Sequence, residues 1–285
     1  MTQSDTAPIA IITGGAGGMG LATAEILARD HRVLLADLDE RRLDEATARL
    51  ADRGVDAATA VCDITDRSSV DAVFSRARSL GALRAVVHTA GVSPQMGRAE
   101  KIIRINALGT VYVTEAALAA AVPGSALVNV SSIAGHLLPS MLMPVRAFRS
   151  ALTGDPDRMA SSLTRMSDLT GSGGPGTAYS LSKAFVIWYS ERMAAEFGRK
   201  SARILSVSPG SFDTEMGRLE KKSGSERMVE FAALKRFGTP EEIAELLAFC
   251  VSAKPGYLTG TDILCDGGNK AGLTLSGMLS MARGR

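Results

Sequence analysis

A glycine-rich turn near the N-terminus constrains the fold of this chain more than any other feature. Residues 9–13 form a short, apolar, β-rich run, which leads directly into Gly14-Gly15-Ala16-Gly17-Gly18-Met19-Gly20 and then into a helical pattern up to about Arg29. Glycines let the backbone approach a ligand closely, and the start of the helix offers N–H groups and a positive dipole end to a pyrophosphate. This order favours a dinucleotide-binding fold over a merely structural turn.

The next predicted strand, residues 32–36, ends on Asp37. In a dinucleotide fold, an acidic residue about 20 positions beyond the glycines accepts hydrogen bonds from the adenosine ribose and repels a 2′-phosphate. The glycine turn contains no Lys or Arg. Arg41 and Arg42 lie further on, within Asp39-Glu40-Arg41-Arg42, which looks like the exposed first turn of a helix with charges placed for its own dipole. We therefore expect NAD rather than NADP.

Strands alternate with helices along most of the chain. The further strands are expected at residues 57–61, 83–88, 126–130, 202–207 and 261–265, and helices are expected at 179–198 and 240–250. Asp66 is the better cap for the helix after the third strand, which leaves Asp63 to contact an adenine amino group. The pattern predicts an α/β fold: a single doubly wound, Rossmann-type parallel sheet of about seven strands, with helices on both faces, in one domain spanning residues 1–285.

The stretch Tyr179-Ser-Leu-Ser-Lys183 carries a candidate proton-transfer pair. On a helix, residues four apart share a face, so the phenol and the ammonium can point into one cleft. A cation within about 4 to 6 Å lowers the pKa of a tyrosine from about 10 toward the range in which the side chain is an efficient general acid or base at neutral pH. Taken alone, the spacing also fits an ordinary amphipathic helix.

Composition narrows the functional class. A net charge of +2 with no basic cluster does not support binding to nucleic acid. Residues 1–8 do not resemble a signal peptide, and no apolar run reaches the roughly 18 residues of a membrane span. Three unpaired cysteines suit a reducing cytoplasm, and the scattered histidines give no metal site. We expect a cytoplasmic protein that acts on a small molecule.

Several motifs occur in a characteristic order. They are Thr13-Gly14-x-x-x-Gly18-x-Gly20, Asp37, Asp63, Ala90-Gly91, Asn106, Ser132, Tyr179-x-x-x-Lys183, Pro209-Gly210 with Thr214, and Asp266-Gly267-Gly268. With these motifs, the chain resembles the short-chain dehydrogenase/reductase family over nearly its whole length.

The resemblance implies four catalytic residues. Tyr179 would exchange the proton on the substrate oxygen, and Lys183 would lower the Tyr179 pKa and hold the nicotinamide ribose. Ser132 would hydrogen-bond the reacting oxygen, and Asn106 would support a proton-relaying water chain. Ser131 and Ser132 could instead be plain loop residues, and Asn106 a helix cap.

The resemblance also implies which residues bind the cofactor, with Thr214 on the carboxamide side of the nicotinamide. These residues are Gly14, Gly18, Met19, Gly20, Asp37, Leu38, Asp63, Ile64, Ala90, Gly91, Tyr179, Lys183, Pro209, Gly210, Phe212 and Thr214.

The chain departs from the family pattern in three places. Thr89 replaces the usual Asn before Ala-Gly, so other hydrogen bonds must fix that turn, and the segment from Gly91 to Asn106 is short. The largest departure is an insertion at residues 137–176, read as two short helices followed by a flexible hinge at 171–176. Its methionines and other apolar residues either pack the insertion onto the domain or form an adaptable lid over a bulky substrate.

These departures, together with a tail at residues 269–285, look most like the 3α-hydroxysteroid dehydrogenase/carbonyl reductase branch. That branch implies a steroid, terpenoid or similar secondary alcohol. It also implies a homo-oligomer, a dimer or tetramer. The insertion could block the usual tetramer or contribute to a different dimer. The tail could dock over the cleft, dock on a second subunit, or remain disordered.

Three functions compete at this point. The leading one is NAD-dependent hydride transfer between the nicotinamide and a hydrophobic secondary alcohol or ketone. An NADPH-dependent ketoreductase is the second, and Asp37 argues against it. The third is a non-catalytic NAD-sensing scaffold, which has no need of Ser132, Tyr179 and Lys183 together.

Overall fold

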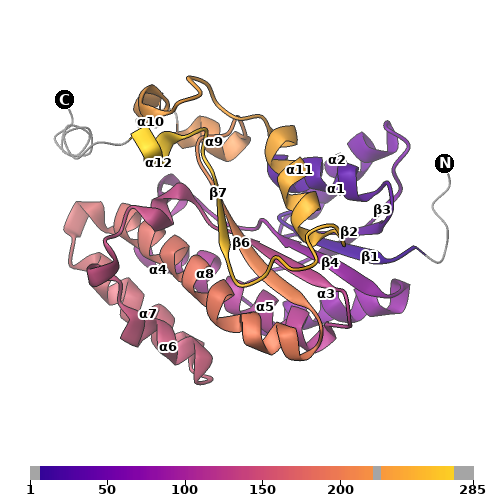
Figure 1. Cartoon of the computed structure of the whole chain (residues 1–285), viewed down its shortest axis with the longest axis horizontal. Coiled ribbons are helices and arrows are strands. Elements are labelled where there is room, and N and C mark those ends of the chain that lie inside the picture. Colours follow the sequence, from indigo (N-terminus) through magenta and orange to yellow (C-terminus); the bar gives the residue numbers. More distant parts are fainter. Residues whose placement is uncertain (1–6, 221–225, 273–285) are drawn as a thin grey trace.

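A computed structural model of the chain describes residues 7–220 and 226–272. Seven strands form one parallel sheet in the order β3-β2-β1-β4-β5-β6-β7 (Figure 1). Their bounds are β1 Ile9–Thr13, β2 Arg32–Asp37, β3 Ala57–Val61, β4 Leu83–His88, β5 Ala126–Val130, β6 Arg203–Pro209 and β7 Asp262–Cys265. The predicted fold class is confirmed, and the predicted strands are displaced by at most two residues at either end.

The strand order reverses between β1 and β4, and this reversal fixes where a ligand can bind. Chain connections run from β1 outward to β2 and β3 on one side, and from β4 outward to β7 on the other. Loops that leave neighbouring strands in opposite directions open a crevice at the carboxyl ends of these strands. The glycine turn follows β1 and Thr89 follows β4, so both lie at this crevice.

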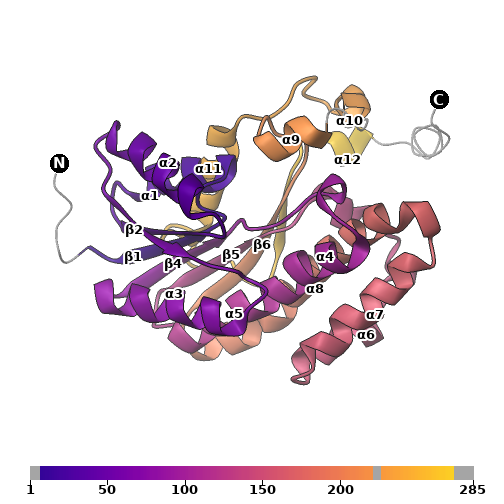
Figure 2. The ribbon, with the colours of Figure 1, turned by 180° about the vertical axis from the view of Figure 1, so that it is seen from behind.

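Helices cover both faces of the sheet (Figures 1 and 2). One face carries α1 Gly18–Leu27, α2 Glu40–Ala51 and α11 Pro240–Val251, and the other carries α3 Arg67–Leu80, α5 Gly109–Ala120 and α8 Gly174–Arg199. The strands are largely apolar because successive side chains enter opposite cores. Ile9 and Ile11 belong to the α3/α5/α8 core, and Ala10 and Ile12 to the α1/α2/α11 core.

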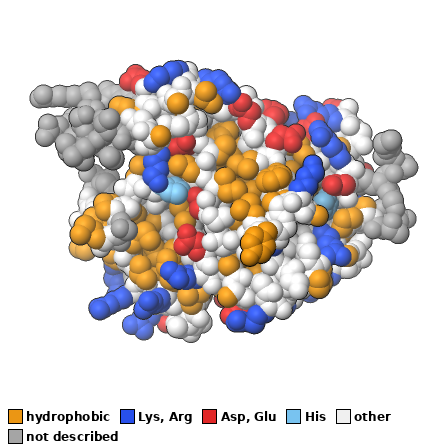
Figure 3. Space-filling model, viewed as in Figure 1, with side chains coloured by type: hydrophobic (Ala, Val, Ile, Leu, Met, Phe, Trp, Pro, Cys, Tyr) orange, Lys and Arg blue, Asp and Glu red, His pale blue; other side chains and the backbone are white. Residues whose placement is uncertain are grey.

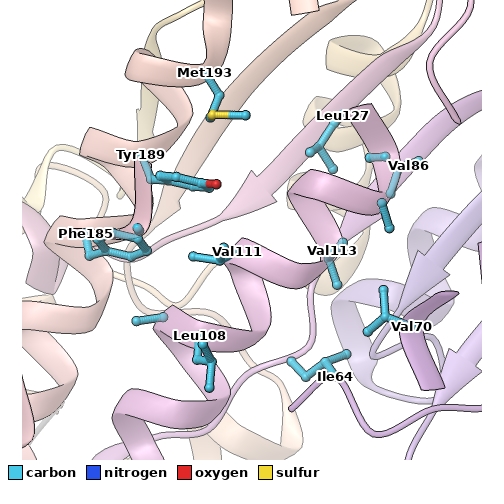
Figure 4. Packing of buried hydrophobic residues seen from close by; sticks show 14 of the residues in the cluster. Ile64, Val70, Val86, Leu108, Val111, Val113, Leu127, Phe185, Tyr189 and Met193 are labelled. Carbon is cyan, nitrogen blue, oxygen red and sulfur yellow. The ribbon is translucent and has the colours of Figure 1, made fainter. Parts of the chain in front are cut away.

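The core on the α3/α5/α8 face is the larger one and includes aromatic rings. Figure 4 shows Phe185, Tyr189 and Met193 of α8 facing Val111 of α5, with Leu127 of the sheet nearby. The rings of Phe185 and Tyr189 stack with centroids 5.2 Å apart. Buried aromatic contacts of this kind fix α8 against the sheet, which matters because α8 carries Tyr179 and Lys183.

The insertion forms η4 Ser140–Leu142, α6 Val145–Leu152 and α7 Pro156–Asp168, which confirms the two predicted helices. Gly154, at φ +82°, ends the first helix, and the Asp155 carboxylate accepts from the N–H of Arg158 to cap the second. Phe148 is fully buried, with its ring 5.3 Å from that of Phe185 and 5.5 Å from that of Trp188. The insertion is thus packed onto the domain through α6 and α7.

The expected glycine hinge at 171–176 is wrong. Gly171–Gly173 form a 3₁₀ turn, η5, and Gly174 is the first residue of α8. Pro175 explains the difference, because a proline in the first helical turn has its φ preset and loses no hydrogen bond there. Helix α8 therefore begins five residues before the predicted start at Tyr179.

The shorter elements lie mostly around the carboxyl end of the sheet. They are η1 Pro94–Met96, α4 Ala99–Ile103, η2 Arg104–Leu108, η3 Ile133–His136, α9 Glu215–Glu220, α10 Glu226–Phe231 and α12 Asn269–Gly272. Of the predicted tail, residues 273–285 lie outside the described residues. Within the described ranges, one helical run, residues 99–120, has the length and apolar composition of a membrane span. An apolar 18-residue window of this run is 72% buried inside the protein, as in a core helix.

Candidate active site

Helix α8 and the end of β5 bring three of the four predicted catalytic side chains to one cavity, which Asn106 does not line. Ser132, Tyr179 and Lys183 line this cavity together with Gly210 and Phe212 from the segment after β6. The Lys183 ammonium nitrogen lies 5.8 Å from the centre of the Tyr179 ring and donates to the carbonyl oxygen of Val130 at 3.0 Å. Lys183 is only 6% exposed, so its charge is held inside the cavity beside the phenol.

The two serines after β5 have different environments. The Ser131 hydroxyl donates to the carbonyl oxygen of Lys183 at 2.7 Å and so ties β5 to α8. The Ser132 hydroxyl oxygen accepts from the N–H of Ala134 at 3.2 Å, and its proton can point to another acceptor. Ser132 is therefore the better placed of the two to donate to a substrate oxygen.

Asn106 lies inside a continuous helical run, where η2 is a single π-helical turn between α4 and α5. It is therefore not a helix cap. Its side-chain oxygen accepts from the N–H of Val92 at 2.8 Å, and its amide nitrogen donates to the carbonyl oxygen of Val92 at 2.9 Å. Asn106 is 1% exposed and fixes the backbone just after Gly91. The proposed water chain stays a prediction.

The glycine turn packs directly against the loop after β4. Gly14 has φ +66°, and a Cβ there would lie 2.7 Å from the backbone nitrogen of Ala90. A Cβ on Gly20 would lie 2.3 Å from the carbonyl oxygen of Gly14. The hydroxyl of Thr89 donates to the carbonyl oxygen of Thr13 at 2.8 Å. This bond fixes the turn in place of the Asn that the family usually has.

The glycine turn opens into a cleft of about 330 Å³. Eleven of the predicted cofactor residues line it: Gly14, Gly18, Met19, Gly20, Asp37, Leu38, Asp63, Ile64, Ala90, Gly91 and Thr214. Pro209, Gly210 and Phe212 line the cavity of Tyr179 and Lys183, which adjoins the cleft and shares Met19, Gly91 and Thr214 with it. All the predicted cofactor residues thus line one continuous region.

The cleft has the features that a dinucleotide needs. The N-cap of α1 is Gly17, so no side chain occupies the first N–H groups of that helix, and a pyrophosphate can accept from them. Asp37 is held in place because its two carboxylate oxygens accept from the N–H groups of Ala16 at 3.2 Å and Leu38 at 2.8 Å. Asp63 is exposed and accepts from Thr65 through one oxygen, while Asp66 caps α3 as predicted.

A buried histidine near the site was not singled out by its sequence. The Thr110 hydroxyl donates its one proton to the carbonyl oxygen of Asn106 at 2.7 Å, so His88 Nε2, 3.2 Å away, must be the donor to Thr110. His88 Nδ1 then accepts from the Thr13 hydroxyl at 2.6 Å. Burial, with a smaller contribution from the charge of Lys183, lowers the His88 pKa to about 3. The imidazole is therefore neutral and joins β1 to the turn that carries Asn106.

Other lining residues were also missed. Among them are Arg42, Met96, Ile105, Glu215, Met216 and Leu219. Glu215, Met216 and Leu219 come from α9, a short helix that follows the Pro209-Gly210 loop. Its sequence carries no motif that would have marked it.

The comparisons with known proteins agree with this geometry. The family model described as short chain dehydrogenase matches residues 8–151, and the model described as Enoyl-(Acyl carrier protein) reductase matches residues 140–270.

Individual relatives cover nearly the whole chain. The chain is 32% identical to short-chain dehydrogenase/reductase bsc3 of Alternaria brassicicola, covering 91% of this chain and 95% of the relative. It is 28% identical to 2-(S)-hydroxypropyl-CoM dehydrogenase 3 of Xanthobacter autotrophicus, with the same coverage. The structure of a short-chain type dehydrogenase/reductase from Mycobacterium ulcerans superposes with a TM-score of 0.76 at 23% identity, covering 100% of this chain and 98% of that one. The chain therefore belongs to the short-chain dehydrogenase/reductase family of oxidoreductases.

Proposed function

We propose that this protein is an NAD-dependent oxidoreductase that interconverts a hydrophobic secondary alcohol and its ketone. The observation that carries this proposal is the convergence of Ser132, Tyr179 and Lys183 on a cavity continuous with the glycine-turn cleft. Such a reaction needs a site for the cofactor and a group that moves a proton. The arrangement supports both, in adjoining parts of one region.

The cofactor supplies the carbon that accepts or donates the hydride, and the chain supplies position and charge. Tyr179 takes the proton from the alcohol oxygen as the ketone forms, and returns it in the reverse direction. The Lys183 ammonium favours the phenolate form of Tyr179, and its hydrogen bond to Val130 keeps it in position. Ser132 donates to the substrate oxygen, which orients the reacting carbon.

Asp37 supports NAD as the cofactor, because its carboxylate lies at the end of β2 where a 2′-phosphate would have to sit. The competing function, an NADPH-dependent ketoreductase, is favoured by one observation. Arg42 lines the same cleft and could pair with that phosphate. The relative strength of NAD and NADP binding separates the two.

Apolar side chains in the cavity support a hydrophobic substrate. Val92, Phe212 and Met216 line it together with Tyr179. The name of the Xanthobacter relative describes a dehydrogenase of a secondary alcohol, which fits the proposed reaction type. Within that type we propose a steroid- or terpenoid-like substrate, as in the hydroxysteroid dehydrogenase branch.

We propose that the insertion acts as a lid over the substrate. The support for this proposal comes from the first turn of the insertion, η4. Met141 is 88% exposed and Leu142 is 64% exposed. Their neighbours Leu138 and Met143 pack on the same hydrophobic cluster as Tyr179. Replacing Met141 and Leu142 by Ser should raise the KM for bulky alcohols and leave that for short alcohols unchanged. Equal effects on both classes would contradict a lid.

We also propose a cytoplasmic homo-oligomer. Hydrophobic side chains gather on the face of the molecule in Figure 3, where β7 forms the sheet edge beside α11. Phe249 and Tyr257 are exposed on or just after α11. Such a face commonly contacts another subunit. Light scattering of the purified chain tests this, and a monomer at micromolar concentration would contradict it.

The reaction is tested by the rate of NADH formation with a panel of steroid, terpenoid and short aliphatic secondary alcohols, repeated with NADP. We expect turnover with NAD that is highest for a bulky alcohol and is lost in Tyr179→Phe. Tight NAD binding without turnover of any alcohol would favour the non-catalytic NAD-sensing scaffold instead.

A further inference from the structure

A cation and a carboxylate from distant parts of the chain meet at the adenosine end of the cofactor cleft. Arg42 lies in the first turn of α2, and Glu215 is the first residue of α9. Arg42 Nη2 lies 2.9 Å from Glu215 Oε2, and both residues line the cleft beside Asp37 and Leu38. The pair therefore joins the two walls of the cleft at the end where β2 stops.

The charges around this end are mostly negative. Among the described residues, the cleft is lined by four carboxylates, those of Asp37, Asp39, Asp63 and Glu215, and by one cation, Arg42. A phosphate monoester carries up to two negative charges at neutral pH, and a guanidinium with open donors is its preferred partner. Arg42 would serve as that partner if its charge were not already paired with Glu215.

We propose that Glu215 is a specificity-determining residue, which neutralises Arg42 and so excludes a 2′-phosphorylated nucleotide. This inference rests on the proposed preference for NAD and deepens it. Asp37 repels the additional phosphate from the β2 side, and Glu215 removes the attraction that Arg42 would otherwise exert from the α2 side. Cofactor choice is then shared between two elements that lie far apart in the sequence.

The neighbouring arginine provides a matched control. Arg41 Nη1 lies 3.0 Å from Glu45 Oε1, four residues along the same helix. Arg41 lines an adjoining groove and is not one of the residues that line the cofactor cleft. Glu45→Gln therefore releases an arginine of the same helix without placing its charge in the cleft.

The test measures the dissociation constants of NADP and NAD by calorimetry for the unsubstituted protein, Glu215→Gln, Glu45→Gln, Arg42→Gln and the double variant Glu215→Gln/Arg42→Gln. In Glu215→Gln, the preference should shift toward NADP on the order of tenfold, the effect of one charge about 6 Å from a dianionic phosphate in water. The shift should shrink with added salt, and it should be clearly smaller when Glu215→Gln is introduced into Arg42→Gln than into the unsubstituted protein, because only the repulsion by Glu215 itself is then lost. Glu45→Gln should leave the preference unchanged.

An unchanged preference in Glu215→Gln, or an equal shift in Glu45→Gln, would overturn the inference. A Glu215→Gln shift of undiminished size in the Arg42→Gln background would also overturn it, because the gain would then not come from the released guanidinium. The underlying preference for NAD is measured on the unsubstituted protein, independently of the variants. Tighter binding of NADP there would refute that preference, whereas the inference depends only on how the substitutions change it.

Discussion

His88 should make this protein less stable in mild acid. The imidazole is fully buried, its two nitrogens are bonded to the hydroxyls of Thr13 and Thr110, and its pKa is lowered to about 3. In the unfolded chain the pKa of a histidine is about 6.5. Between these two values the unfolded state binds a proton that the folded state does not, so stability falls as the pH falls from about 6.5 toward 3.

The size of the effect follows from the difference between the two pKa values. Each pH unit within this window costs about 1.36 kcal/mol, so His88 alone should remove about 2 kcal/mol between pH 7 and pH 5. His88→Asn keeps a hydrogen-bonding side chain that does not titrate. It should lower stability at pH 7, because bonds to Thr13 or Thr110 are weakened, but it should show a smaller loss between pH 7 and pH 5.

The assay is urea unfolding at pH 5, 6 and 7, at one protein concentration, for the unsubstituted protein and His88→Asn. The slope of the unfolding free energy against urea should agree between the two proteins, so that midpoints convert to free energies. The two stability curves should converge by about 2 kcal/mol as the pH falls from 7 to 5. Parallel curves would refute a neutral, buried His88.

Two further substitutions test the cofactor cradle and the insertion. Gly20→Ala places a Cβ 2.3 Å from the carbonyl oxygen of Gly14, so the turn must open and the rise in Tm on adding NAD should disappear; Gly198→Ala, where a Cβ would meet no atom within 4 Å, should keep that rise. Phe148→Ala should cost about 3 to 5 kcal/mol in urea unfolding because it leaves a cavity among aromatic rings. Leu142→Ala, at an exposed position, should cost less than about 0.5 kcal/mol, and equal losses would contradict the packing of α6.

The sequence was sufficient to predict the sheet and the residues along its carboxyl edge. Parallel strands place every residue that follows a strand at one edge, so Asp37, Ala90, Ser132 and Pro209 could be brought together without knowledge of any contact. The Thr89 substitution likewise required another hydrogen bond, which the structure supplies through the carbonyl oxygen of Thr13.

Features that depend on long-range pairing or backbone detail could not be predicted. His88 and Thr13 are 75 residues apart, and Arg42 and Glu215 are 173 residues apart, so no local pattern indicates either contact. Asn106 is a common capping residue, yet the helix continues past it through a π turn. The glycines at residues 171–176 suggested a hinge, where α8 instead begins at Gly174 with Pro175 in its first turn.

The most direct test of the central claim compares Tyr179→Phe with the unsubstituted protein, using NAD and the best alcohol of the panel. The substitution removes the proton-transfer group and keeps the ring, so the dissociation constant of NAD should change little while kcat/KM falls by about 10² to 10⁴. Unchanged kcat/KM in Tyr179→Phe, with NAD still bound, would contradict the assignment of Tyr179 as the acid/base.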